Sequence, residues 1–137
     1  MLDRAQILRR LGVTGLDRDH YWVLAGAAMV LHGVKPETPD IDLGCDTALA
    51  DALQAAGYET MIDPDGSRRI RYGADMELFE NWRAGQVERI ENIPVLSLAG
   101  IVELKRRLGR EKDQRDIALI RDFLKNHVEI CKSYEKR

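Results

Sequence analysis

The chain has 137 residues, of which 45% are hydrophobic and 32% are charged, and its formal net charge at pH 7 is −2. This length is enough to bury a core without disulfides, so we expect one domain spanning residues 1–137. The near-neutral charge argues against general adhesion to nucleic acids or anionic membranes. No apolar run approaches the ~20 residues that cross a bilayer. The two cysteines are far apart and the first residues lack the order of a secretion signal, which predicts a reduced, cytoplasmic setting.

The first half of the chain alternates between helix and strand signals. Asp3 can cap a helix, and the apolar run that starts at Tyr21 is typical of a buried strand. Gly26 interrupts that run before a second helix, and two prolines then require an extended loop. We expect elements at residues 3–11 (helix), 21–25 (strand), 27–32 (helix), 34–39 (loop), 40–45 (strand) and 47–56 (helix).

The second half predicts strands followed by helices. The turn sequence Asp-Pro-Asp-Gly at 63–66 separates two short apolar-polar segments and indicates a hairpin. We expect strands at residues 58–62, 67–72, 74–80 and 87–90, and helices at 97–108 and 113–131. The order predicts an α/β (α+β) fold with a mixed β-sheet, flanking helices, a core over about residues 20–95 and a helical C-terminal cap over about 97–131.

One pair of acidic residues has the pattern of a metal site. The sequence contains three Asp-x-Asp triplets, but two of them lie in a polar loop and in the hairpin turn. In Asp40-Ile-Asp42-Leu, the strand period of two places both carboxylates on one face. Like charges held side by side are costly unless a cation compensates them, and carboxylate oxygens suit Mg²⁺ or Mn²⁺. An exposed sheet edge kept soluble by its acids is the alternative interpretation.

Further features lie around this pair. Gly26 stands between a buried strand and a short helix, an arrangement that presents backbone N–H groups to a phosphate. Asp75 is an acid on a later predicted strand. A plain strand-to-helix turn and a solvent-facing strand residue are the respective alternatives.

Four motifs in the same order resemble the polymerase-beta-type nucleotidyltransferase superfamily, and more narrowly its minimal bacterial members, which include abortive-infection and toxin–antitoxin proteins. The resemblance covers about residues 21–123. The motifs are Leu-Ala-Gly-Ala-Ala-Met-Val-Leu-His-Gly (24–33), Thr-Pro-Asp-Ile-Asp-Leu (38–43), Val-Leu-Ser-Leu-Ala-Gly-Ile-Val-Glu-Leu-Lys (95–105) and Gly-Arg-Glu-Lys-Asp-Gln-Arg-Asp-Ile (109–117).

The resemblance implies a role for each matching position. Asp40, Asp42 and Asp75 would form one carboxylate cluster that binds divalent metal and orients or deprotonates the attacking hydroxyl. Gly26 and the amide of Ala27 would hold the β,γ-phosphates of a nucleoside triphosphate. The sequence departs from the family at Ala27, where Gly or Ser is usual, and at Pro36, where a basic residue is usual.

Two lysines complete the expected nucleotide site. Lys35 stands beside Pro36, and Lys105 lies on the apolar stripe of its helix, from which it can reach a triphosphate or pair with Asp113 or Asp116. For Lys105 we favour the structural pairing. The basic run 105–115, to which it belongs, is either a solvated helix surface or a phosphate-facing patch.

Other candidates are ranked lower. Glu77 shares a strand face with Asp75 and is the alternative third carboxylate. Arg69 and Arg71 share a strand face, where solvent exposure is favoured over contact with substrate anions.

The resulting hypothesis is a metal-dependent enzyme that moves a nucleoside monophosphate from a nucleoside triphosphate to an acceptor hydroxyl. The alternative is a catalytically weak or inactive nucleotide- or partner-binding protein of a toxin–antitoxin or phage-defence system. A chain this short leaves little room for a separate acceptor-binding domain, so we expect a homodimer or a protein partner to supply one. The acceptor and the base preference are left open by the sequence.

Overall fold

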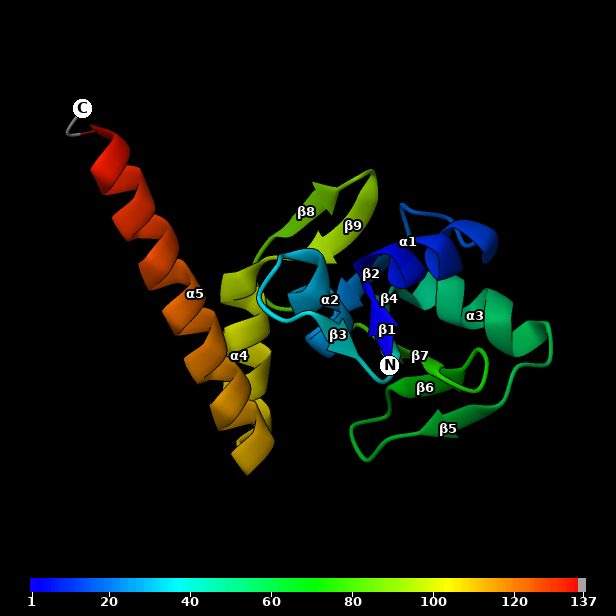
Figure 1. Ribbon diagram of the computed structural model, residues 1–137. Helices are drawn as coiled ribbons and strands as arrows, with labels where there is room; N and C mark the ends of the chain where they lie inside the picture. Colours follow the sequence, from blue (N-terminus) through cyan, green and yellow to red (C-terminus); the bar gives the residue numbers. More distant parts are fainter. Residues whose placement is uncertain (136–137) are drawn as a thin grey trace.

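The computed structural model describes the backbone of residues 1–135 and the side chains of residues 1–127 (Figure 1). The helices are α1 (Arg4–Val13), α2 (Ala25–Leu31), α3 (Thr47–Ala55), α4 (Leu98–Leu108) and α5 (Glu111–Glu135). The strands are β1 (Leu2–Asp3), β2 (Tyr21–Leu24), β3 (Glu37–Thr38), β4 (Ile41–Cys45), β5 (Thr60–Ile62), β6 (Arg68–Arg71), β7 (Met76–Glu80), β8 (Val87–Ile90) and β9 (Ile93–Leu96).

Seven of the strands form one mixed sheet in the order β5-β6-β7-β4-β2-β9-β8. The pairs β4–β7 and β2–β9 are parallel, and the other four neighbouring pairs are antiparallel. The two-residue strands β1 and β3 pair separately, so that the start of the chain is tied to the loop before β4. This architecture confirms the predicted mixed sheet with flanking helices.

The two faces of the sheet differ in chemistry. On one face, the central strands contribute apolar side chains that are fully buried, and α1 adds Ile7 and Leu11 to this core. Because side chains alternate along a strand, the opposite face carries the intervening residues of the same strands, and we call it the polar face because Asp42, Glu77, Arg71 and Arg69 lie on it. The candidate site lies on this second face.

Local chemistry explains most helix boundaries. Asp3 accepts a hydrogen bond from the Gln6 amide and Asp46 accepts one from the Leu49 amide, as expected for N-caps. Gly109, with φ of 64°, ends α4 in the left-handed conformation that favours glycine. Gly12 does not end α1, which continues to Val13.

The C-terminal helices form the predicted cap. Helices α4 and α5 lie side by side along one flank of the sheet, and α5 extends past the rest of the molecule (Figure 1). Within the described residues, no helix combines the length and apolarity that a membrane crossing requires.

Candidate functional site

The polar face of the sheet carries two rows of side chains across its strands. One row runs through Leu24, Asp42, Glu77 and Arg71, which are successive register partners on β2, β4, β7 and β6. The neighbouring row runs through Trp22, Gly44, Phe79 and Arg69. The first row therefore places two acidic side chains next to each other at the centre of the sheet.

The second row forms an aromatic floor beside these acids. The indole of Trp22 lies across Gly44, where an added Cβ would come within 2.0 Å of the indole nitrogen. That nitrogen donates to the carbonyl oxygen of Trp82 at 2.9 Å. Gly44 is thus required because the ring occupies the space of any side chain at this position.

Among the acids of the site, Asp42 has the pKa that departs most from its ordinary value. Burial raises its pKa from 3.8 to about 6, and the negative charges of Asp40 and Glu77 add to this effect. Lys112 and Lys105 oppose it more weakly. Among the described residues, no hydrogen-bond donor or ion-pair partner reaches the Asp42 carboxylate. A half-buried carboxylate that faces two further acids without a direct counter-charge is a favourable position for a cation.

Asp75 does not join this group. The guanidinium of Arg10 on α1 donates to both oxygens of the Asp75 carboxylate, in one case at 2.8 Å. The same contact lowers the pKa of Asp75, with hydrogen bonding from Arg10 as the main cause. Only the backbone of Asp75 approaches β4, because its carbonyl oxygen accepts from the Ile41 amide at 2.8 Å. The expected three-aspartate cluster is therefore not assembled, and Glu77 occupies the place beside Asp42.

The start of α2 is where the expected glycine step lies. No side chain caps this helix, and the strain falls on Ala25, whose φ of 50° is unusual for a residue with a side chain. Gly26 is required for a different reason, since an added Cβ would lie 2.4 Å from the hydroxyl oxygen of Thr38. Ala27 is buried in the core, so that only its backbone amide remains for a ligand.

A chain of ion pairs links this region to the C-terminal helices. Asp116 on α5 contacts Lys35 at 3.2 Å and Lys105 at 2.8 Å. Lys105 is only 7% exposed and also lies 3.6 Å from the fully buried Asp113. The preferred interpretation of Lys105 as a structural partner of these acids is confirmed. Lys35 lies beside Gly26, with its Nζ atom 3.9 Å from where a Cβ of Gly26 would be.

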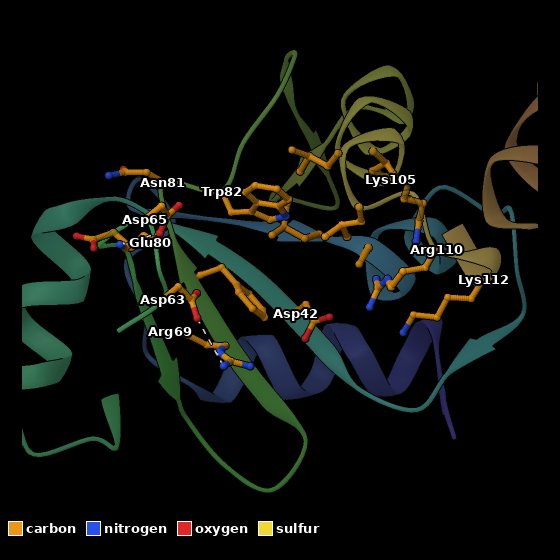
Figure 2. A pocket seen from close by; sticks show the side chains of 17 residues that line it. Asp42, Asp63, Asp65, Arg69, Glu80, Asn81, Trp82, Lys105, Arg110 and Lys112 are labelled. Atoms are coloured by element: carbon orange, nitrogen blue, oxygen red, sulfur yellow. Dashed lines mark hydrogen bonds and ion pairs between the residues drawn. The ribbon is translucent and has the colours of Figure 1, made fainter. Parts of the chain in front are cut away.

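A cavity of about 490 Å³ opens between the polar face and α4. Lys105, Arg110 and Lys112 lie together on one side of it, Asp63, Asp65, Glu80 and Asn81 lie on the other, and Asp42 lies between them (Figure 2). Leu24, Ala25, Ser67, Arg69, Phe79, Trp82, Ile101, Leu104 and Leu108 complete the lining. The basic run 105–115 therefore divides. Three of its cations line the cavity, whereas Arg106, Arg107 and Arg115 do not line it.

The donor set is suited to a divalent cation in its chemistry. Asp40, Asp42 and Glu77 offer hard oxygen ligands, and Asp42 has no other counter-ion in direct contact. In the part of the chain that the structure describes, however, no three acidic, histidine or cysteine side chains already stand in a metal-holding arrangement. Glu77 is held by Arg71 at 2.9 Å, so that metal binding would require this pair to open.

Several residues of the cavity were not expected from the sequence. Arg110 and Lys112 lay within a run whose solvated and phosphate-facing sides could not be separated without the position of α4. Phe79 and Trp82 come from β7 and from the loop after it, and their meeting with Trp22 depends on sheet order. The period of two along β7 is the one signal that identified Glu77.

Comparison with known proteins supports the fold. No protein-family model matches the sequence, and no curated protein matches it. The chain is similar to a crystal structure of a candidate nucleotidyltransferase from Thermotoga maritima, with a TM-score of 0.54 and 18% sequence identity. The match covers 89% of this chain and 90% of the other. At this identity the similarity shows a nucleotidyltransferase-like fold.

Proposed function

We propose that this protein is a metal-dependent nucleotidyltransferase, which moves a nucleoside monophosphate from a nucleoside triphosphate to an acceptor hydroxyl. The observation that carries the proposal is Asp42, a half-buried carboxylate next to Glu77 in a cavity whose other wall is basic. Such opposed charges suit a substrate that brings both a cation and phosphates. The nucleotidyltransferase-like fold and the sequence resemblance give independent support.

In this proposal, the basic residues of the cavity bind the triphosphate and its acidic residues bind the metal. Arg110 and Lys112 would bind the β- and γ-phosphates, together with the uncapped amides at the start of α2. Lys105 and Lys35 would contribute less, because Asp116 already holds both ammonium groups, and Arg110 would bind phosphate beside its own ion pair with Asp113 at 2.7 Å. With the β- and γ-phosphates bound in this way, the α-phosphate would lie near Asp42 and the open face of the sheet.

Asp40, Asp42 and Glu77 would hold Mg²⁺ or Mn²⁺, and such a cation neutralises charge on the α-phosphate and on the departing pyrophosphate. We propose Glu77 as the third carboxylate in place of Asp75, because Glu77 is the register partner of Asp42, whereas Arg10 binds both oxygens of Asp75. In the reaction, the acceptor oxygen forms a bond to the α-phosphorus and the bond to pyrophosphate breaks. The hydroxyl proton passes to a carboxylate of this group as the new bond forms.

We further propose that the protein belongs to the minimal bacterial nucleotidyltransferases, that residues 1–137 act as one domain, and that it functions in the cytoplasm. The four ordered motifs support the subgroup. A homodimer or a partner protein is proposed to extend the acceptor site, since the polar face of the sheet is open beside the cavity.

The test combines binding and transfer. Calorimetry would measure binding of each ribonucleoside triphosphate with Mg²⁺, with Mn²⁺ and with EDTA. Transfer of label from each α-labelled triphosphate to the protein itself, to RNA and to small hydroxyl compounds would be measured in parallel. Asp42→Asn is the test variant, and Asp122→Asn, an exposed acid on α5, is the matched control.

The proposal predicts metal-dependent binding and label transfer that Asp42→Asn removes and Asp122→Asn retains. Metal-dependent binding without transfer to any acceptor would favour the non-catalytic alternative. Absence of metal-dependent triphosphate binding would contradict the transferase proposal and leave only the partner-binding form of the alternative.

A further inference from the structure

The end of the cavity opposite the basic wall contains several acids, but most of them are already engaged. Glu80 is bound by Arg68 at 2.6 Å, and Asp65 accepts from the hydroxyl and the amide of Ser67 at 2.6 and 2.9 Å. A cationic ligand would have to displace these contacts. The free hydrogen-bonding capacity of this end must therefore be sought elsewhere.

That capacity lies in Arg69. Its guanidinium lines the cavity from β6, next to Phe79 in the register, and about a third of its side chain is exposed. One terminal nitrogen lies 3.6 Å from a carboxylate oxygen of Asp63, which is a long distance for an ion pair. Among the described residues, the Nε–H of Arg69 is the one buried side-chain donor without an acceptor. Leaving such a donor unpaired costs free energy, which a ligand oxygen would recover.

The geometry of a guanidinium restricts what that oxygen belongs to. The Nε–H and the adjacent terminal N–H groups form a planar fork that matches the two oxygens of a carboxylate or phosphate. Asp63 reaches the edge formed by Nε and Nη2 only through Nη2 and only at 3.6 Å, so an oxyanion that also accepts from Nε–H would displace this weak contact.

We propose that Arg69 is the acceptor-binding residue, and that the acceptor carries a carboxylate or phosphate near its reactive hydroxyl. This inference rests on the proposed function, because it assigns the hydroxyl to the Asp42 region and the anionic group to the far end of the same cavity. Polycationic acceptors are disfavoured, since they would meet acids already paired and a guanidinium of like charge.

The test observes Arg69 directly by NMR of the ¹⁵N-labelled protein. A buried Nε–H exchanges slowly with water and gives its own arginine side-chain signal. Loss of this signal in Arg69→Lys assigns it to Arg69. Through-bond correlations in the wild-type protein give the assignment independently of whether that variant folds. The probes are sulfate, glycerate and glycerol 3-phosphate, with glycerol, spermidine and chloride at equal ionic strength as comparisons.

The proposal predicts a saturable shift of the Arg69 Nε–H signal with sulfate, glycerate and glycerol 3-phosphate, and none with glycerol. The relative strength of glycerate and glycerol 3-phosphate distinguishes a carboxylate from a phosphate. Arg115→Gln, an exposed arginine on α5, should leave the shift unchanged. A response to spermidine, or anion effects no larger than that of chloride, would overturn the proposal. Because no metal or triphosphate is added, this result is independent of whether the transferase proposal holds.

Discussion

Replacing Asp42 by Asn should stabilise the folded protein while removing its proposed ligand binding. Burial raises the pKa of Asp42 from 3.8 to about 6, so the folded protein holds a proton on this group over a pH range where the unfolded chain has lost it. Stability must then fall as pH rises through that window and stay lowered above it. At about 1.4 kcal/mol per pH unit of difference, the ionised carboxylate costs the metal-free fold on the order of 2–3 kcal/mol.

The measurement is urea unfolding of wild-type and Asp42→Asn protein in EDTA from pH 4 to pH 8. The two free energies of unfolding should be similar near pH 4, and the variant should be more stable by about 2–3 kcal/mol above pH 7. Most other titrations are common to both proteins and cancel in this difference. Adding Mg²⁺ or Mn²⁺ should stabilise only the wild type. A difference that does not change with pH, or a variant less stable at pH 8, would refute the reasoning.

Three further substitutions test other parts of the site. Gly26→Ala should cost about 1–3 kcal/mol by overpacking against Thr38, and Thr38→Ala in the same chain should recover most of that loss in a double-mutant cycle by urea unfolding. Arg10→Gln should cost about 1 kcal/mol near neutral pH, a value discounted for the partial exposure of both partners, because it removes the contact that lowers the pKa of Asp75. This loss of stability should shrink as acid protonates Asp75. Calorimetry should find triphosphate binding nearly unchanged. Lys105→Met should cost about 1–3 kcal/mol in thermal or urea unfolding, because Asp113 and Asp116 lose the buried ammonium group but keep Arg110 and Lys35 as partners. A Lys105→Met protein of wild-type stability would show that the ion pairs contribute little to the fold.

Much of the fold could be predicted because its signals are local. The alternation along β4, the turn at 63–66 and the N-caps at Asp3 and Asp46 all depend on residues within a few positions of one another. Strand β9 was not predicted, since it contains a proline and is defined by parallel pairing with a strand about 70 residues earlier. Its neighbour β8 was found at the predicted residues.

The candidate site was predictable in composition but not in its partners. The strand period placed Asp42 and Glu77 on compatible faces, and register confirms that they are neighbours. By the same period Asp75 was an equally good candidate for the third carboxylate. Only the structure shows that Arg10, 65 residues away, already binds its carboxylate. The strained backbone at Ala25 could not be read from its residue type, because alanine normally avoids this conformation.

The central claim is that the carboxylate of Asp42 couples a divalent cation to a triphosphate in one cavity. Its most direct measurement is calorimetric titration of a triphosphate with a non-hydrolysable α,β-bridge into metal-free protein, repeated after addition of Mn²⁺. We predict that Mn²⁺ strengthens the affinity of the wild type at least tenfold, about 1.4 kcal/mol, and leaves that of Asp42→Asn unchanged. Equal affinities with and without Mn²⁺ in the wild type, or the same metal effect in Asp42→Asn, would contradict the account.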